Sequence, residues 1–188
     1  SASGGTISEE EKRMLVESVI EQVKEDGTAK VHLLSEIKTT SDNGAARLTK
    51  YGNDLAKTIV SNVSSVKENE LIIVGQAVEK KDEKLLNKLP PIETMYRNLL
   101  ASLLLLEAPS SLAKTHLDFI NAYEGILSAT TNMKLVFADP LNGAIGITRY
   151  VQYVRIIEAL ALSLGDYFLK NNVSFGEQDP AYGLFVTQ

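Results

Sequence analysis

The fold of this chain is decided by a long apolar block, which opens at residues 90–106 with the sequence PPIETMYRNLLASLLLL. Proline suits the first turn of a helix, where its missing N–H has no partner to lose, so Pro91 is a natural first residue. Apolar side chains then recur on two sides of the predicted helix, one carrying Met95, Leu99, Leu103 and Leu106 and the other Ile92, Tyr96, Leu100 and Leu104. A helix that is apolar on two sides is predicted to be largely buried.

The apolar block continues beyond this helix and ends near Val173. Pro109 and Asp139-Pro140 divide it, because proline removes a helical hydrogen bond and clashes with the preceding turn. These divisions predict one helix over residues 110–137 and another over residues 141–170, each about 42–45 Å long at 1.5 Å per residue. Short connections make consecutive helices antiparallel neighbours.

The end of the block carries two further signals. Gly143 and Gly146 leave one face of the last helix without side-chain bulk, which predicts close packing against a neighbouring helix. Asn171-Asn172 then ends the helix. The aromatic residues of the C-terminal tail are expected to anchor that tail to the bundle; they are Phe175, Tyr182 and Phe185.

Residues 1–90 carry most of the charged side chains, so we expect this half to be the more solvated one. Ser8 and Glu11 form a capping-box pattern, which predicts a helix running to Asp26-Gly27. Asp42 and Asn43-Gly44 open a second helix, whose apolar face is Leu48, Tyr51, Leu55, Ile59 and Val63. A third is predicted over residues 68–89, with the face Leu71, Val74, Val78, Leu85 and Leu89, and Pro90-Pro91 as its end.

Between the first two helices, residues 28–40 lose the helical period. Val31, Leu33 and Ile37 fall on one parity, whereas His32 lies on the other with Lys30 and Glu36. Alternation of this kind is typical of extended chain. We therefore predict a short extended connector near residues 29–39, packed across the bundle, with His32 exposed.

These elements predict an all-α protein, an elongated up-and-down helical bundle of four or more main helices. Residues 1–5, Ser-Ala-Ser-Gly-Gly, are interpreted as a cloning remnant that does not belong to the fold. Residues 6–188 are then expected to form one helical domain, since the length suits a single core. Its parts are an N-terminal helix and connector (6–41), a solvated helical pair (42–89), apolar core helices (90–171) and a C-terminal tail (172–188).

Composition restricts the partners of the protein. The net charge is −5 with a pI near 5.2, and the lysines are scattered among acidic residues, so no nucleic-acid partner is expected. The absence of cysteine removes disulfides, thiolate catalysis and cysteine metal sites. The longest apolar stretch, Leu99–Leu106, lies between Arg97 and Glu107 and falls short of the about 20 residues that span a bilayer.

Catalytic and metal sites are poorly supported by the two histidines. A di-iron bundle needs Glu-x-x-His on two helices, but the residue three before His116 is Ala113. His116, Asp118 and Glu124 could form an acid/base group, but Asp118 lies two residues from His116 and so points to another side of the helix. We expect a hydrogen-bonded structural histidine, no cofactor and no metal, and hence a noncatalytic protein.

One aromatic set offers a candidate binding groove. Tyr150, Tyr153, Tyr167 and Tyr182, together with Phe168, can line a groove for a peptide or a lipid. Aromatic side chains at helical spacing more often belong to the core, with their hydroxyls at its edge. Both interpretations remain open at the level of sequence.

Ordered motifs over about residues 30–185 resemble a set of uncharacterised exported helical proteins of ultrasmall candidate-phyla bacteria. The motifs are Ser35-Glu36-Ile37, Lys50-Tyr51-Gly52-Asn53-Asp54-Leu55, Asn69-Glu70-Leu71, Leu112-Ala113-Lys114-Thr115-His116-Leu117, Asp139-Pro140-Leu141, and Phe175 followed by Asp179-Pro180-Ala181-Tyr182. The resemblance implies a helical domain outside the cytoplasm, held by an N-terminal membrane anchor that this sequence lacks. Some members are encoded near pilus or secretion genes. The resemblance carries over no catalytic residue.

The leading hypothesis is therefore a noncatalytic, extracytoplasmic scaffold or protein-interaction module at the cell surface. We expect it to bind a protein partner. The alternative is a carrier that holds a lipid or another apolar ligand between the C-terminal helices. It is motivated by the apolar content of residues 90–106, which exceeds what one buried face requires.

Overall fold

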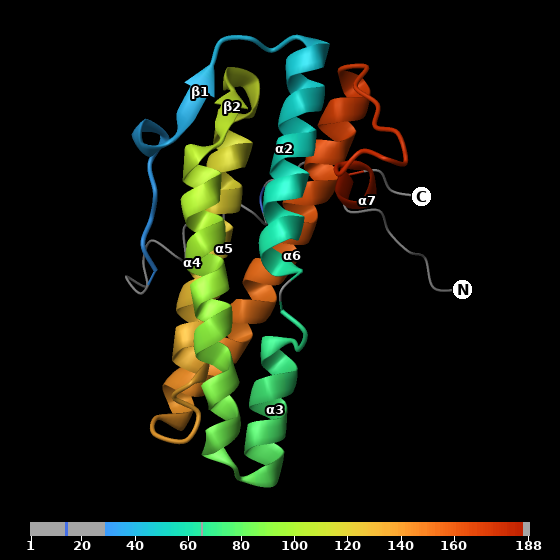
Figure 1. Ribbon diagram of the computed structural model, residues 1–188. Coiled ribbons are helices and arrows are strands. Elements are labelled where there is room, and N and C mark those ends of the chain that lie inside the picture. Colours follow the sequence, from blue (N-terminus) through green and yellow to red (C-terminus); the bar gives the residue numbers. More distant parts are fainter. Residues whose placement is uncertain (1–13, 15–28, 65, 186–188) are drawn as a thin grey trace, which may run out of the picture.

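The computed structural model describes Met14, residues 29–64 and residues 66–185, and it is mostly α-helical (Figure 1). The all-α class and the helical bundle are confirmed. The predicted helix over residues 8–26 lies outside the described residues. Among the residues that are described, the sheet consists of two short strands.

The elements follow one another as long helices joined by short 3-10 turns. The α-helices are α2 (Ala45–Val63), α3 (Glu70–Lys80), α4 (Leu89–Leu105), α5 (Ala113–Met133), α6 (Pro140–Lys170) and α7 (Tyr182–Phe185). The 3-10 helices are η1 (Leu34–Glu36), η2 (Glu83–Lys88) and η3 (Ser110–Leu112), and the strands are β1 (Lys38–Thr40) and β2 (Glu107–Pro109).

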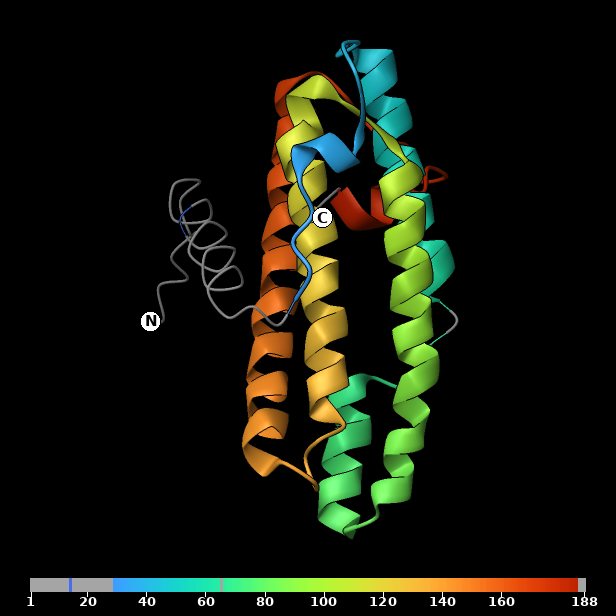
Figure 2. The same ribbon diagram turned by 90° about the vertical axis from the view of Figure 1, so that its left-hand side faces the viewer.

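Helices α4, α5 and α6 run up and down beside one another along the bundle, while α2 lies beside the upper half of α4 and α3 beside its lower half (Figures 1 and 2). One continuous apolar core lies between them. Its largest fully buried side chains come from all five helices and are Tyr51, Phe119, Phe168, Leu48, Leu55, Ile73, Leu89, Leu99, Leu103, Ile120, Met133 and Ile156.

The predicted helix over residues 68–89 is wrong in its C-terminal half. Helix α3 ends at Lys80, because Lys81 takes the left-handed conformation with φ 51° and Asp82 caps the following 3-10 turn through the N–H of Lys84. Pro90 and Pro91 do not end a helix; they lie in the first turn of α4, which begins at Leu89. The prolines therefore act here as helix starters.

The buried face of α3 also differs from the prediction. Glu70, Ile73, Val74 and Ala77 face the core, whereas Val78, assigned to the apolar face, is half exposed. On α2 the predicted face is confirmed from Leu48 to Ile59.

The predicted extended connector is interrupted by η1 at Leu34–Glu36 and forms a strand only from Lys38, and its buried parity is the opposite one at its start. His32 is buried and Leu33 is exposed, because the backbone of His32 is held by the side chain of Asn121 on α5. Strand β1 then pairs in parallel with β2, with Lys38 opposite Glu107 and Thr40 opposite Pro109. The prediction that His32 is exposed is wrong.

Helix α5 is shorter than the predicted span of residues 110–137. It is preceded by η3 and ends at Met133, where Leu135 and Val136 turn back onto Asn132 and Met133 through backbone hydrogen bonds. Helix α6 extends over the predicted span, starting one residue earlier at Pro140, with Asp139 as the N-cap.

The two long helices α5 and α6 approach each other closely at glycines. A Cβ on Gly143 would lie 2.6 Å from Cα of Val136, and one on Gly146 would lie 2.8 Å from the backbone N of Met133. Neither distance is compatible with a side chain unless the backbone moves. The predicted close packing of Gly143 and Gly146 is confirmed.

On the other side of α6 the C-terminal tail lies between α6 and α2, which make little direct contact with each other. Phe175 packs edge-on against Phe168 of α6 and also contacts Gly52 of α2. Asn53 of α2 donates to the carboxylate of Asp179 and accepts from the N–H of Ala181. The tail thus adds to the direct contact that Phe168 of α6 makes with Gly52 of α2.

Candidate functional site

The tyrosines proposed from the sequence to line a groove lie at different levels of the bundle. Tyr150 and Tyr153 are buried, whereas Tyr167 and Tyr182 are partly exposed near the C-terminal end of α6. Tyr150 and Tyr167 are separated by about 25 Å along the helix at 1.5 Å per residue. A groove shared by all four tyrosines stays a prediction.

Tyr150 belongs to a buried polar cluster at the middle of the bundle, near the start of α3. The carboxylate of Glu70 accepts hydrogen bonds from the hydroxyl groups of Tyr96 at 2.6 Å and Tyr150 at 2.8 Å. Asn69 caps α3 through the N–H of Leu71 and donates to the Tyr150 hydroxyl at 3.4 Å. This cluster connects the start of α3 to α4 and α6.

The electrostatics of the cluster keep both phenols protonated. Burial raises the pKa of Tyr96 and of Tyr150 well above the ordinary value, and the neighbouring charge of Glu70 raises both further. Both hydroxyls therefore serve as donors at neutral pH. Glu70 lies in the first turn of α3, where the helix dipole also favours a negative charge. The arrangement satisfies a buried carboxylate without a cation.

Tyr153 fills space where α5 has no side chain. A Cβ on Gly125 of α5 would lie within 2.1 Å of the Tyr153 ring, so the ring packs directly on the helix backbone. Tyr153 is therefore part of the α5–α6 contact. This placement is the core role that aromatic residues at helical spacing usually have.

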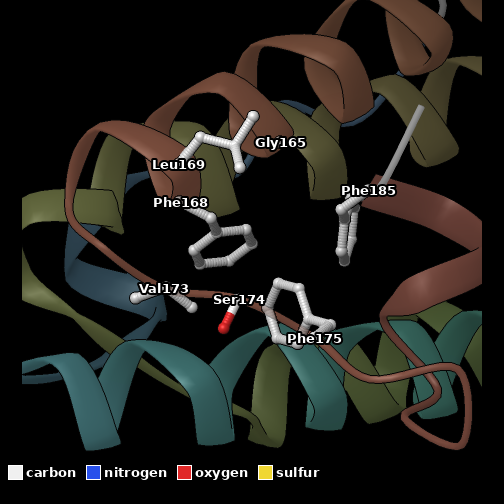
Figure 3. A pocket seen from close by; sticks show the side chains of 7 residues that line it. All are labelled: Gly165, Phe168, Leu169, Val173, Ser174, Phe175 and Phe185. Carbon is white, nitrogen blue, oxygen red and sulfur yellow. The ribbon is translucent and has the colours of Figure 1, made fainter. Parts of the chain in front are cut away.

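An apolar pocket of about 190 Å³ lies beneath the tail, between α6 and α7 (Figure 3). Phe168 reaches it from α6, Phe175 from the tail and Phe185 from α7, with ring centroids 5.1 Å and 5.8 Å from that of Phe168. The other lining residues are Gly165, Leu169, Val173 and Ser174. Ser174 is the only polar side chain among these seven.

The sequence offered little signal for this pocket. Phe175 and Phe185 were identified as anchors of the tail, but Phe168 was assigned to the tyrosine groove. Gly165 was not singled out, although the backbone oxygen of Phe185 would lie 2.3 Å from a Cβ on it. The pocket depends on α7, a single helical turn that no periodicity predicts.

His116 is a structural histidine, as expected. Its ring is fully buried, with Nε2 3.0 Å from the carbonyl oxygen of Leu103 and Nδ1 3.0 Å from the Tyr51 hydroxyl. Because Nε2–H must donate to the carbonyl, Nδ1 accepts from Tyr51. Burial lowers the pKa of His116, and the bond to Leu103 offsets this in part. The neutral imidazole thus joins α2, α4 and α5.

His32, not His116, lies beside Glu124. Its Nε2 is 3.4 Å from a carboxylate oxygen of Glu124, and its Nδ1 is 3.3 Å from Glu36. Sequence separation hides this contact, since 92 positions lie between His32 and Glu124. Glu124 and Asn121 of α5 thus hold the connector at His32, whereas Glu36 belongs to the connector itself.

A second buried carboxylate is compensated by cations. Lys134 Nζ lies 2.6 Å from one oxygen of Glu93, and Arg97 lies 3.9 Å from the other. The Thr131 hydroxyl also donates to Glu93. This network connects α4 to the end of α5.

Comparison of the chain with protein-family models, with curated proteins and with solved structures found no match. Within residues 29–64 and 66–185, no helix is both long enough and apolar enough to cross a bilayer. In the same part of the chain, no group of three or more His, Asp or Glu side chains is placed to hold a metal ion.

Proposed function

We propose that this protein is a noncatalytic helical scaffold whose task is to bind another protein. The observation that carries the proposal is a group of exposed leucines at one end of the β1–β2 ladder. Leu33 and Leu34 are 61% and 57% exposed just before β1, and Leu105 is 66% exposed just before β2.

The exposed leucines lie toward the same end of the ladder. Because β1 and β2 are parallel, the segments that precede them lie at the same end of the ladder. Single exposed apolar side chains are ordinary, whereas a group of them is typical of an interaction surface. Arg47 fixes the ladder to α2 by donating to the backbone oxygen and the carboxylate of Glu107, so the surface is held on a rigid support.

The proposal places the protein outside the cytoplasm, anchored in the membrane by its N-terminus and associated with surface, pilus or secretion machinery. Support for this location comes from the resemblance to exported proteins of ultrasmall bacteria. Protease treatment of intact native cells tests it, since an external domain is digested and an internal one is protected.

Site-specific photo-crosslinking in native cells tests the partner. A photoreactive phenylalanine analogue at Leu34 and another at Leu105 should capture the same protein, and Leu34→Asp should abolish capture from position 105. Leu141 is the matched control, because it is 72% exposed and lies at the opposite end of the bundle, at the start of α6. Equal capture from Leu141, or none from the ladder positions, would contradict the proposal.

The second candidate is a carrier for a lipid or another apolar ligand held between the C-terminal helices. The pocket beneath the tail favours some apolar ligand, although its volume of about 190 Å³ is smaller than the roughly 300–1,000 Å³ of sites for drug-sized molecules. Native mass spectrometry of the protein purified from its own cells tests the carrier, since a bound lipid adds its mass.

A further inference from the structure

We propose that the pocket beneath the C-terminal tail is a binding site for a small, uncharged ligand built around one aromatic ring. Its argument is separate from that for the leucine surface. The site also differs from that of a lipid carrier, because its volume takes a single ring. Each of these proposals can fail without the others.

The size of the pocket sets the size of the ligand. An engineered cavity of about 150 Å³ lined by aliphatic and aromatic side chains stays dry and binds benzene. The pocket here has about 190 Å³, which leaves room for one ring with a small substituent. A long acyl chain does not fit within this volume.

The lining sets the chemistry of the ligand. Three phenylalanines surround the space, and the Phe168 ring meets those of Phe175 and Phe185 at 82° and 61°. Edge-to-face pairs of this kind leave ring faces and edges that a further aromatic ring can meet in the same way. None of the described residues that line the pocket carries a charge, so burying a carboxylate or an ammonium group beside them is unfavourable. Ser174 can form one hydrogen bond with a polar substituent.

The pocket is held open by the packing around it. The tail cannot move closer to α6 at Gly165, where the Phe185 backbone already occupies the Cβ position. Phe175 is fixed from the other side by α2, since its ring fills the Cβ position of Gly52. The tail is further tied to α2 by Asn53. Phe175 and Phe185 are thus held in place by contacts outside the pocket, which is the preorganisation that a binding site needs.

Thermal unfolding with three probes of similar size tests the site. Toluene at about ten times its Kd should raise the Tm by about 3–5 °C, because a ligand that binds only the folded state stabilises it. Cyclohexane should bind more weakly, since it lacks the aromatic edge, and benzoate should leave the Tm unchanged. No rise with toluene, or an equal rise with benzoate, would overturn the proposal.

A variant locates the binding. Ser174 is exposed at the edge of the pocket, so Ser174→Phe places a ring over the space and should remove the toluene effect. Gln178→Phe is the matched control, because Gln178 is exposed on the same tail but does not line the pocket, and it should keep the effect. Independently of any variant, nuclear Overhauser contacts should connect toluene to the methyl groups of Val173 and Leu169. Contacts elsewhere on the protein would also overturn the proposal.

Discussion

Helix α6 packs against α5 on one side and against the C-terminal tail on another, and the two contacts differ in how closely the backbones approach. Near the start of α6, Gly143 and Gly146 let its backbone approach the end of α5 and the turn after it without side chains between them. Near the end of α6, the rings of Phe168, Phe175 and Phe185 lie between the helix and the tail. Close backbone contact leaves no space for a ligand, whereas the wider separation contains a pocket where the rings do not fill it.

The contrast also concerns how firmly each contact is fixed. The α5–α6 contact joins two long helices whose own hydrogen bonds hold their shape. The tail contact depends on a short segment that ends in the single turn of α7. Binding sites tend to lie on such segments held by a rigid support, because the segment can adapt while the support stays in place.

Phe168→Ala should have the largest effect, since it removes the central ring of the tail contact. Phe168 is fully buried and touches both Phe175 and Phe185. Truncating a buried phenylalanine lowers the free energy of unfolding by about 3–5 kcal/mol. Urea denaturation followed by circular dichroism measures this change. The neighbour Leu169 is largely exposed, so Leu169→Ala should change stability by less than about 0.5 kcal/mol. Equal losses from the two variants would show that the ring is not a support of the tail.

Gly146→Ala tests the opposite contact. The new methyl group would lie 2.8 Å from the backbone N of Met133 and 2.9 Å from the carbonyl oxygen of Ala129, so α5 and α6 must separate. Overpacking of this kind lowers the free energy of unfolding by about 1–3 kcal/mol. Gly75→Ala is the control of opposite sign. Gly75 lies inside α3 with nothing near its Cβ position, so alanine should stabilise the protein by about 0.5–1 kcal/mol. A neutral Gly146→Ala variant would contradict the close approach.

Tyr96→Phe tests the polar cluster, which lies on neither contact but fixes α3 to the rest of the bundle. The substitution removes one of the two hydroxyl donors to the buried Glu70 carboxylate. Hydrogen bonds to charged groups contribute about 1.5–3 kcal/mol, and Tyr150 keeps part of that here, so we expect a loss of about 1–2 kcal/mol. Hydrogen exchange should report the loss mainly in α3. Tyr123 packs beside Tyr96 without bonding to Glu70, so Tyr123→Phe should leave the exchange of α3 unchanged.

The parts of the fold that were predicted correctly are those in which neighbouring residues on one helix decide the outcome. The stripe from Leu48 to Ile59 on α2 and the span of α6 follow from local periodicity. The predicted stripe on α3 included Val78, which is exposed, and did not include Glu70. In fact Glu70, Ile73, Val74 and Ala77 form a regular stripe with a carboxylate in it.

The parts that were missed depend on partners far away in the chain. His32 is buried through Asn121, 89 positions later, and Glu70 through Tyr150, 80 positions later. Neither distance leaves a trace in local periodicity. Lys81, which separates α3 from η2, takes the left-handed conformation, and the sequence did not predict it for another reason. This conformation is favoured by glycine or asparagine, so a lysine gives no sequence signal for it. The pocket was missed for both reasons: it joins segments that are apart in the chain, and one of them is a single helical turn without a sequence signal.

The smallest effect we predict is a dependence of stability on pH, and it comes from the side of α5 that faces α2 and α4. Burial holds the pKa of His116 below its ordinary value near 6.5, because the charged ring loses its hydration in the core, and the bond to the Leu103 carbonyl offsets this only in part. In the unfolded chain His116 takes up a proton as the pH falls through about 6.5, whereas in the folded chain it does not until a lower pH. The unfolded state therefore binds more protons in that window, and the free energy of unfolding should fall as the pH decreases below about 6.5.

Urea denaturation of the protein and of His116→Gln, measured at several pH values between about 7 and 5, separates this contribution from that of the carboxylates. The variant should be less stable at pH 7 but should lose less stability on acidification. Parallel pH profiles of the protein and the variant would contradict a contribution from His116.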